Sequence, residues 1–314
     1  MAVPFTGLGL YNGFRGNRWL KNRIKIFKQF VIPSLRNQTN NNFVLWCSWR
    51  HEEKNNPLVR ELIQYLDQIK EFKTVHTFHG ICFYDDKYDE REARSRLLES
   101  LRGSIGELLD TIGEVDYVYM TIQPSDDCYS EGVVSGIQKV FEESDVQAFG
   151  FDRGYIINYL TKQVKEYNPE TNPPFYTIKF PRDVFADPLK HADFTSLKRD
   201  VGGYKAGTPI PSHEYVKDAL KYGTVRAREF MVGCHLDNTS TVFDHPYAGD
   251  DVDPMILSKF GLSAAENLII PFSFGKYVLN RLPYGAKRKL RYWSGERKWI
   301  MRPFFAAVYN FLRS

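Results

Sequence analysis

Apolar and polar residues recur along this chain with two periods, one typical of helices and one typical of strands. Apolar side chains follow helical spacing in the segments 19–35, 57–70 and 92–109, which predicts three amphipathic helices. Short runs rich in β-branched and aromatic residues predict strands, at 3–10, 43–47, 74–84, 115–122, 149–160, 175–180 and 224–234. Helices that alternate with strands imply parallel pairing and right-handed crossovers. The predicted class is therefore α/β, with a mixed, mainly parallel sheet flanked by helices.

The segment after Trp19 shows the helical pattern most clearly. Lysine and arginine lie opposite an apolar face that consists of Leu20, Ile24, Phe27, Val31 and Leu35. An Asn-rich turn and the strand at 43–47 follow, which completes a strand–helix–strand unit. The stretch 181–211, in contrast, is rich in Asp, Lys, Gly and Pro and is predicted to be a loop.

Two adjacent carboxylates follow the predicted strand at 115–122. Asp126 and Asp127 come between this strand and an alternating run at 131–141 that predicts a helix. Two acids on a loop that leaves a central strand suit a hard divalent cation, and a cation suits a diphosphate. The alternative is that Ser125, Asp126 and Asp127 form a turn and a helix cap, which Ser and Asp favour in general.

Composition restricts the class of protein. The chain has 314 residues, 43% of them hydrophobic and 25% charged, as in a globular protein rather than a disordered one. No apolar run approaches the roughly 20 residues that span a bilayer, and the N-terminus lacks the features of a signal peptide. The four cysteines are scattered without a CxxC pair, which favours a reducing compartment. These features predict a cytoplasmic protein.

The net charge of +4 is unevenly distributed. Residues 281–314 hold nine Lys or Arg against one Glu, whereas the preceding part of the chain is net acidic. Aromatic residues are interleaved with the basic ones in this tail, a composition that suits an anionic membrane surface. The alternative is a C-terminal helix that packs on the core with a basic outer face. Nucleic acid is not expected as a partner, because the body is acidic and no recognition motif is present.

Several motifs near the N-terminus resemble those of a known family. R-x-x-x-F, then P-S-L-x-x-Q-T, then N-F-V-L resemble the opening of nucleotide-sugar glycosyltransferases with the GT-A fold. Within these, the chain is most similar to the rhamnosyltransferase-like family of bacterial polysaccharide loci. The matching residues are Arg23, Phe27, Pro33, Ser34, Leu35, Gln38, Thr39 and Phe43. The resemblance implies that Gln38 and Thr39 lie at the donor site, whereas the residues by themselves favour a cap at a helix end.

The resemblance also gives the acidic loop a role. The GT-A fold carries a D-x-D motif on this loop, which implies that Asp126 and Asp127 hold Mn²⁺ or Mg²⁺ on the donor diphosphate. Pro124 and Ser125 stand where the first acid is expected, which leaves open a catalytically inactive or metal-independent relative. His235 is the third metal ligand that the resemblance implies. Its alternative is a strand-end histidine bonded to a loop carbonyl.

An acid at the start of a later helix is the catalytic base that the resemblance implies. Glu214 has this position, and His213 is the neighbouring candidate. A carboxylate or imidazole must reach the acceptor hydroxyl, because an unassisted alcohol is a poor nucleophile. The helix dipole alone also favours a Glu in a first helical turn.

These expectations combine into one predicted protein. Residues 1–247 are predicted to form a GT-A-like (Rossmann-like) domain, and residues 248–314 a helical extension that is basic and aromatic from 281. The predicted function is metal-assisted transfer of rhamnose or another hexose from a nucleoside diphosphate sugar to a glycan or lipid-linked acceptor, in polysaccharide biosynthesis at the inner face of the membrane. The alternative is a catalytically inactive protein that binds a nucleotide sugar or a glycan.

Overall fold

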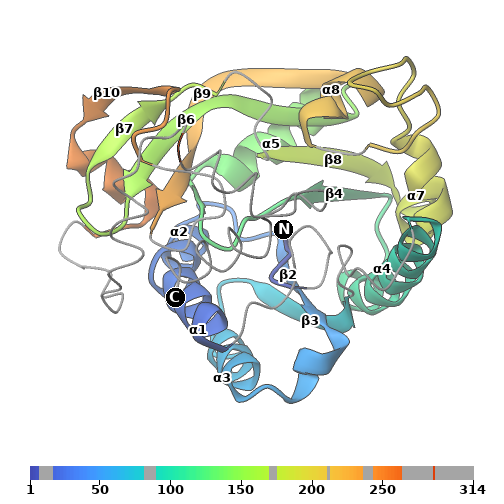
Figure 1. The fold of residues 1–314 in the computed structure, drawn as a ribbon, viewed down its shortest axis with the longest axis horizontal. Coiled ribbons are helices and arrows are strands. Elements are labelled where there is room, and N and C mark those ends of the chain that lie inside the picture. The colour runs from blue at the N-terminus through green and yellow to red at the C-terminus, as the bar shows by residue number, and fades with distance from the viewer. Residues whose placement is uncertain are drawn as a thin grey trace.

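Two groups of hydrogen-bonded strands form the frame of the fold in the computed structural model (Figure 1). The structure describes residues 1–6, 17–80, 90–169, 175–210, 213–235, 243–263 and 286. The first sheet is parallel throughout and contains β1 (Ala2–Val3), β2 (Val44–Arg50) and β3 (Lys73–Gly80). The second sheet contains β4 (Tyr117–Thr121), β5 (Cys128–Tyr129), β6 (Ala148–Asn158), β7 (Val164–Tyr167), β8 (Tyr176–Pro181), β9 (Tyr222–Cys234) and β10 (Ala248–Val252).

The two sheets are connected by a parallel bridge between Ala2 and Ile122. In the second sheet, β8 is antiparallel to both β4 and β6, and β9 runs parallel to β6. Parallel pairing therefore dominates the N-terminal half, while the antiparallel pairs of β7 and β10 extend the C-terminal half. The predicted mixed α/β class is confirmed. Pairing is mainly parallel only in the first sheet, because five of the six pairs between the described strands of the second sheet are antiparallel.

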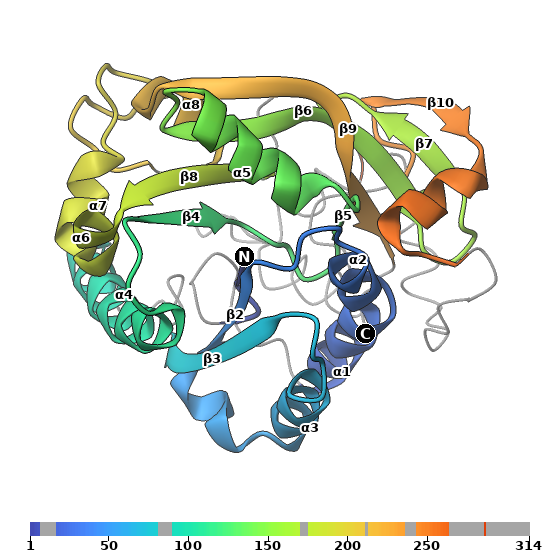
Figure 2. The same cartoon turned by 180° about the vertical axis from the view of Figure 1, so that it is seen from behind.

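Helices cover both faces of this frame (Figures 1 and 2). One face of the first sheet packs on a long N-terminal helix and on α3 (Pro57–Leu66), and the other face packs on α4 (Glu90–Ile112). The second sheet is covered by α5 (Val133–Glu143). Shorter helical segments are η2 (His51–Asn55), α6 (Arg182–Ala186), α7 (Pro188–Phe194), η3 (His213–Tyr215), α8 (Val216–Ala219) and η4 (Pro254–Phe260).

The N-terminal helix has three parts, α1 (Asn17–Ile26), a π-helical turn η1 (Phe27–Val31) and α2 (Ile32–Arg36). All five side chains predicted for its apolar face are buried. Ile26 and Phe30 are buried as well, in a different cluster, so the helix packs on two faces rather than the predicted one. Proline has no N–H, and its ring would meet the carbonyl four residues earlier in a regular helix. A wider turn directly before Pro33 accommodates this constraint.

The prediction of a loop at 181–211 is wrong in its first part, where α6 and α7 form. The Asp187 carboxylate accepts a hydrogen bond from the Leu189 N–H, 3.0 Å away, and Pro188 occupies the first turn of α7. An N-cap acid followed by proline is a helix-start signal, and the overall polarity of the stretch concealed it. Phe185 at the end of α6 is fully buried, so these helices belong to the core.

Part of the predicted C-terminal extension belongs to the body of the fold. β10 pairs with β7, and Leu257, Phe260 and Leu262 are buried beside Phe30. The basic tail at 281–314 lies outside the described residues except for Ala286, so its predicted helix and membrane contact stay predictions. No helix in the described ranges is long and apolar enough to cross a membrane.

Candidate functional site

The loop after β4 is fixed by strand pairing. It leads into β5, whose Cys128 and Tyr129 pair antiparallel with Met231 and Phe230 of β9. Because β9 ends at Cys234, this pairing places the loop beside the last residues of β9. The two acids that the sequence singled out therefore lie next to the predicted histidine.

Asp126 joins two side chains from distant parts of the chain. Its Oδ2 forms an ion pair with the guanidinium of Arg23 on α1 and lies 3.1 Å from Nε2 of His235. Burial acts to raise the pKa of Asp126, but the charge of Arg23 and the hydrogen bond to His235 outweigh it and hold that pKa below its usual range. Asp126 is therefore ionised. An ionised carboxylate can accept hydrogen bonds and cannot donate them, so Nε2 of His235 carries the proton.

Asp127 has a different environment. Its Oδ1 accepts a hydrogen bond from the backbone N–H of Gly233, 2.9 Å away. Burial, together with the negative charge of Asp126, raises the pKa of Asp127 well above its usual value. Neither acid caps a helix, because α5 begins at Val133 and its N-cap is Gly132. The alternative for these residues was a turn that also caps a helix. The turn is present, but the helix cap is not.

Backbone contacts hold this loop in place. The Gln123 side-chain amide donates to the carbonyl oxygens of Pro124 and Asp127. The Tyr159 hydroxyl donates to the carbonyl oxygen of Asp126 over 2.8 Å. A Cβ at Gly233 would lie 2.2 Å from both this carbonyl oxygen and the Tyr159 ring. Glycine is therefore required at 233 by the close approach of the loop.

Gln38 and Thr39 make contacts within the protein. The buried Gln38 amide donates to the carbonyl oxygen of Ser130 and accepts from the N–H of Val134. Thr39 donates to the carbonyl oxygen of Glu131 through its N–H, over 2.8 Å, and through its hydroxyl. These bonds attach the end of α2 to the β5–α5 connection. Gln38 also donates to the Ser34 carbonyl oxygen in α2, 3.1 Å away, so Gln38 caps a helix end as the alternative expected, whereas these Thr39 bonds do not. Their predicted contact with a donor stays a prediction.

His213 and Glu214 lie at the other end of β9 from His235. Both residues belong to η3, which precedes α8 and the start of β9. β9 has 13 residues, and a strand of that length extends up to about 40 Å. Figure 2 shows α8 and β5 near opposite ends of β9. The structure thus brings together Asp126, Asp127 and His235, and it does not bring His213 or Glu214 to them.

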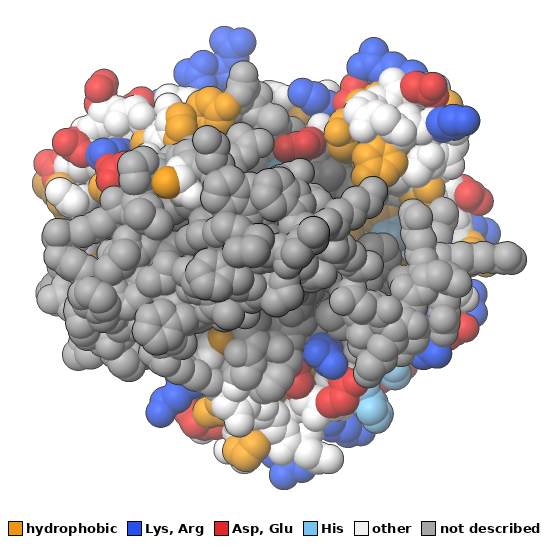
Figure 3. Space-filling view, in the orientation of Figure 1, with side chains coloured by type: hydrophobic (Ala, Val, Ile, Leu, Met, Phe, Trp, Pro, Cys, Tyr) orange, Lys and Arg blue, Asp and Glu red, His pale blue; other side chains and the backbone are white. Residues whose placement is uncertain are grey.

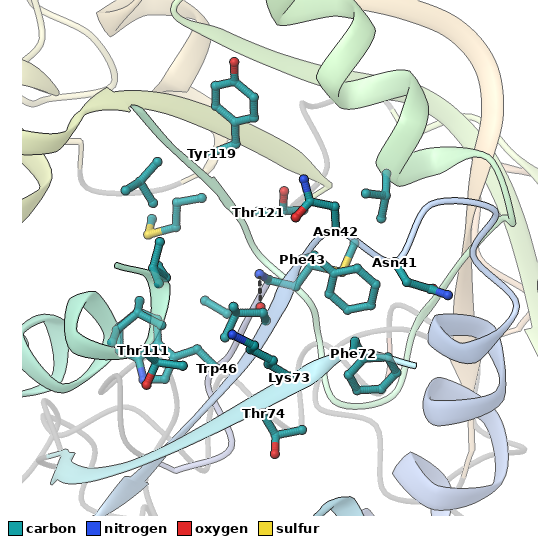
Figure 4. A pocket seen from close by; sticks show the side chains of 18 of the residues that line it. Asn41, Asn42, Phe43, Trp46, Phe72, Lys73, Thr74, Thr111, Tyr119 and Thr121 are labelled. Carbon is teal, nitrogen blue, oxygen red and sulfur yellow. Dashed lines mark hydrogen bonds between the residues drawn. The ribbon is translucent and has the colours of Figure 1, made fainter. Parts of the chain in front are cut away.

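A cavity of about 890 Å³ opens at the opposite edge of the strands (Figure 4). The first residues of β2 and β3 line it together with β4 and α5, and Phe43, Phe72 and Tyr119 are among its side chains. Among the described residues that line it, Arg23, Asp126 and His235 are not found. Ligands of open α/β sheets bind beyond the carboxyl ends of the strands, which is the edge of the Asp126 loop and not of this cavity.

The side chains predicted as metal ligands do not fit a divalent cation well. Within the part of the chain that the structure describes, no three His, Cys, Asp or Glu side chains form a metal-binding group. The carboxylate of Asp126 is already paired with Arg23. Two like unit charges 4 Å apart repel by about 4 kcal/mol at an effective dielectric constant of 20, so a cation at Asp126 would have to displace the guanidinium. The predicted use of Mn²⁺ or Mg²⁺ stays a prediction.

Arg23 is the site residue to which the sequence assigned no role. It is the first residue of the R-x-x-x-F motif, but the periodicity of a helix does not say which distant acid an arginine meets. The sequence offers one signal, which is that Arg23 comes three residues after Leu20 and four before Phe27 and so borders the apolar face. Arg23 is only 6% exposed, and a buried arginine requires a partner.

Comparisons with known proteins give weak likenesses. No family model and no curated protein matches the chain. A crystal structure of residues 1–349 of S. aureus TarS aligns at 10% identity with a TM-score of 0.35, over 68% of this chain and 58% of that one. The same TarS fragment in complex with UDP-GlcNAc aligns at 11% identity with a TM-score of 0.39, over 98% and 78%. Scores this low carry no argument about function, so the family expected from the motifs stays a prediction.

Proposed function

We propose that this protein is a glycosyltransferase that moves a sugar, rhamnose or another hexose, from a nucleoside diphosphate donor to a glycan or lipid-linked acceptor. The observation that carries the proposal is the buried group formed by Arg23, Asp126 and His235. Asp126 of this group lies on the loop that leaves β4 at the carboxyl edge of an α/β sheet, where such sheets bind nucleotides. The motif resemblance from Arg23 to Thr39 supports the same class.

The reaction requires two kinds of assistance from the protein. Negative charge develops on the diphosphate as its bond to the sugar breaks, and polar groups held in a dry site stabilise that charge. The guanidinium of Arg23 is such a group, held at the site by its ion pair with Asp126, on a loop that Gln123 and Tyr159 fix. The acceptor hydroxyl must also lose its proton to a base. A retaining or an inverting outcome is compatible with these requirements.

A second candidate function is binding without turnover. It is favoured by the position of His213 and Glu214 at the far end of β9 from His235. If neither residue reaches the sugar donor, the predicted base is missing from the reaction centre. The protein would then bind a nucleotide sugar or a glycan without transferring it.

Turnover assays separate the two candidates. The protein is incubated with UDP-, GDP- and dTDP-sugars, and release of the nucleoside diphosphate is measured by chromatography. We expect release from one of these donors, and a rate about 100-fold lower in Asp126→Asn, because Arg23 loses the carboxylate that holds it in a preorganised position. Arg36→Met is the control, since Arg36 makes an exposed ion pair with Glu71 on another part of the surface. Binding without release would favour the second candidate, and absence of both would contradict each of them.

Location and pathway are part of the proposal as well. We propose a cytoplasmic protein in polysaccharide biosynthesis whose residues 281–314 contact an anionic membrane surface. The support for this is the composition of the tail, with nine basic residues against one acid. On the face shown in Figure 3, basic and acidic side chains of the described residues are interspersed around the rim rather than gathered in one basic patch.

A further inference from the structure

We propose that Arg23 takes the place of a divalent cation at this site, so that the protein binds its anionic ligand without a metal. The ligand's identity as a nucleoside diphosphate rests on the function proposed above. The inference that Arg23 excludes a metal does not rest on that function, because it follows from the residues of the site alone.

The position of Arg23 is set by the helix that carries it. Leu20, three residues before it, and Ile24, directly after it, are buried on the first sheet, and Ile26 is buried in a second cluster. A helix packed on two faces cannot rotate without exposing apolar surface. The guanidinium is therefore held at Asp126 by the core, and not by the flexible reach of a surface side chain.

The chemistry of the guanidinium fits the ligand. Arginine is charged at all physiological pH values and presents its N–H donors in a planar fork that matches the oxygens of carboxylate and phosphate alike. Asp126 supplies such oxygens in the structure, and a diphosphate would supply the same kind of oxygen to the same fork. A fixed guanidinium can thus stabilise a diphosphate at the place where a metal ion would otherwise do so.

Arg23 also opposes binding of a metal. Mn²⁺ and Mg²⁺ bind carboxylate oxygens directly, and the Asp126 Oδ2 that would serve is in contact with Arg23 and with His235. Without Arg23, the same site should bind a metal. Removing the guanidinium leaves a carboxylate and a histidine side by side, which is a donor pair that Mn²⁺ accepts.

Mn²⁺ titration of metal-free protein tests this inference, followed by calorimetry or by the electron spin resonance of free Mn²⁺. Wild type is expected to bind no stoichiometric Mn²⁺, and Arg23→Met to bind one ion per chain. Arg23→Met combined with Asp126→Asn should lose that ion again. Arg36→Met should behave as wild type, and Arg23→Lys should also stay free of Mn²⁺, because it keeps the charge. Circular dichroism confirms that each variant is folded.

Nucleotide binding provides the second measurement. UDP, GDP and dTDP are titrated in EDTA and in Mn²⁺, and the affinity of wild type for the nucleotide that binds should agree within about twofold between the two conditions. Arg23→Met should weaken that affinity in EDTA by at least about tenfold, the effect of one hydrogen bond to a charged group.

The outcomes against the inference are equally definite. One Mn²⁺ per chain in wild type that Asp126→Asn removes would overturn it, as would a folded Arg23→Met variant that binds no Mn²⁺. A tenfold tightening of nucleotide binding by Mn²⁺ in wild type would also overturn it. If no nucleotide of the panel binds, the proposed function fails, and the Mn²⁺ titrations still decide the role of Arg23.

Discussion

Asp126 and Asp127 are adjacent in sequence and differ in almost every physical respect. Asp126 faces a guanidinium and an imidazole, whereas Asp127 faces a backbone N–H and the charge of its neighbour. The first carboxylate is therefore held in its ionised form, and the second is driven toward its neutral form. Their contributions to stability should differ accordingly.

Replacing each acid by its amide measures this difference. Asp126→Asn leaves the buried Arg23 without its counter-charge and should lower the free energy of unfolding by about 3–5 kcal/mol. Asp127→Asn keeps an oxygen that can accept from Gly233 and removes an unfavourable charge, so we expect a cost of less than about 1 kcal/mol. Urea unfolding at pH 7 gives both values, and equal costs would contradict the assignment.

The loss in Asp126→Asn should also depend on pH. The folded pKa of Asp126 lies below its unfolded value, so its contribution is complete above pH of about 4 and disappears as the pH falls through the folded pKa. The difference in unfolding free energy between wild type and Asp126→Asn should therefore shrink when the same measurement is made at pH 3. A difference independent of pH would show that the ion pair does not stabilise the fold.

The sequence identified part of this site at the level of residues. It singled out Asp126, Asp127 and His235 as neighbours, and the structure brings them together. It could not give the partner of Arg23, because contact between a helix face and a distant loop depends on how the helix packs. It associated Glu214 with the same site because the family resemblance implies it, although the predicted strand at 224–234 already separates Glu214 from His235.

At the scale of elements, the candidate site depends on how closely β9 and the Asp126 loop approach. The two-residue strand β5 sets this distance by pairing with β9, and Gly233 permits it. Periodicity predicted the longer strands and the buried face of the first helix. It could not reveal β5 or the short β7, because two to four residues carry too little of the alternating pattern.

Gly233→Ala tests the close approach. The added Cβ would overlap with the Asp126 carbonyl and the Tyr159 ring, so we expect a loss of about 1–3 kcal/mol in unfolding free energy and a displaced loop. Gly136→Ala is the matched control in α5, where nothing lies within 4 Å of the new Cβ. Since alanine favours a helix, this control should gain about 0.5–1 kcal/mol. Thermal melts of both variants give the comparison, and a neutral Gly233→Ala would refute the tight contact.

At the scale of the whole molecule, the described residues that follow 247 contribute to the core and do not form a separate extension. η4 places Phe260 against the N-terminal helix and β6, where Phe260 is fully buried. The predicted division at residue 247 could not show this, because it marks the point where the family resemblance fades, and the basic composition begins only near residue 281. The same face of the core supports Phe30 and Tyr159, so it also supports the candidate site.

Phe260→Ala tests this contribution of η4. Loss of a fully buried phenylalanine should lower the unfolding free energy by about 3–5 kcal/mol. Met255→Ala in the same segment is the control, because Met255 is 80% exposed and should change stability by less than about 0.5 kcal/mol. Guanidinium unfolding measures both. Similar small effects would mean that η4 is not part of the cooperative core.

The π-helical turn at Phe27–Val31 has a consequence for how relatives of this chain should be compared. There the Ile32 N–H donates to the carbonyl of Phe27, five residues back instead of the usual four, so the turn holds one residue more than a regular one. One residue corresponds to about 100° of rotation in an α-helix. The extra residue therefore sets how α1 is rotated relative to α2, and with it whether Arg23 faces the Asp126 loop. A homologue that kept the arginine but had a one-residue gap in this turn would preserve the motif and lose the ion pair.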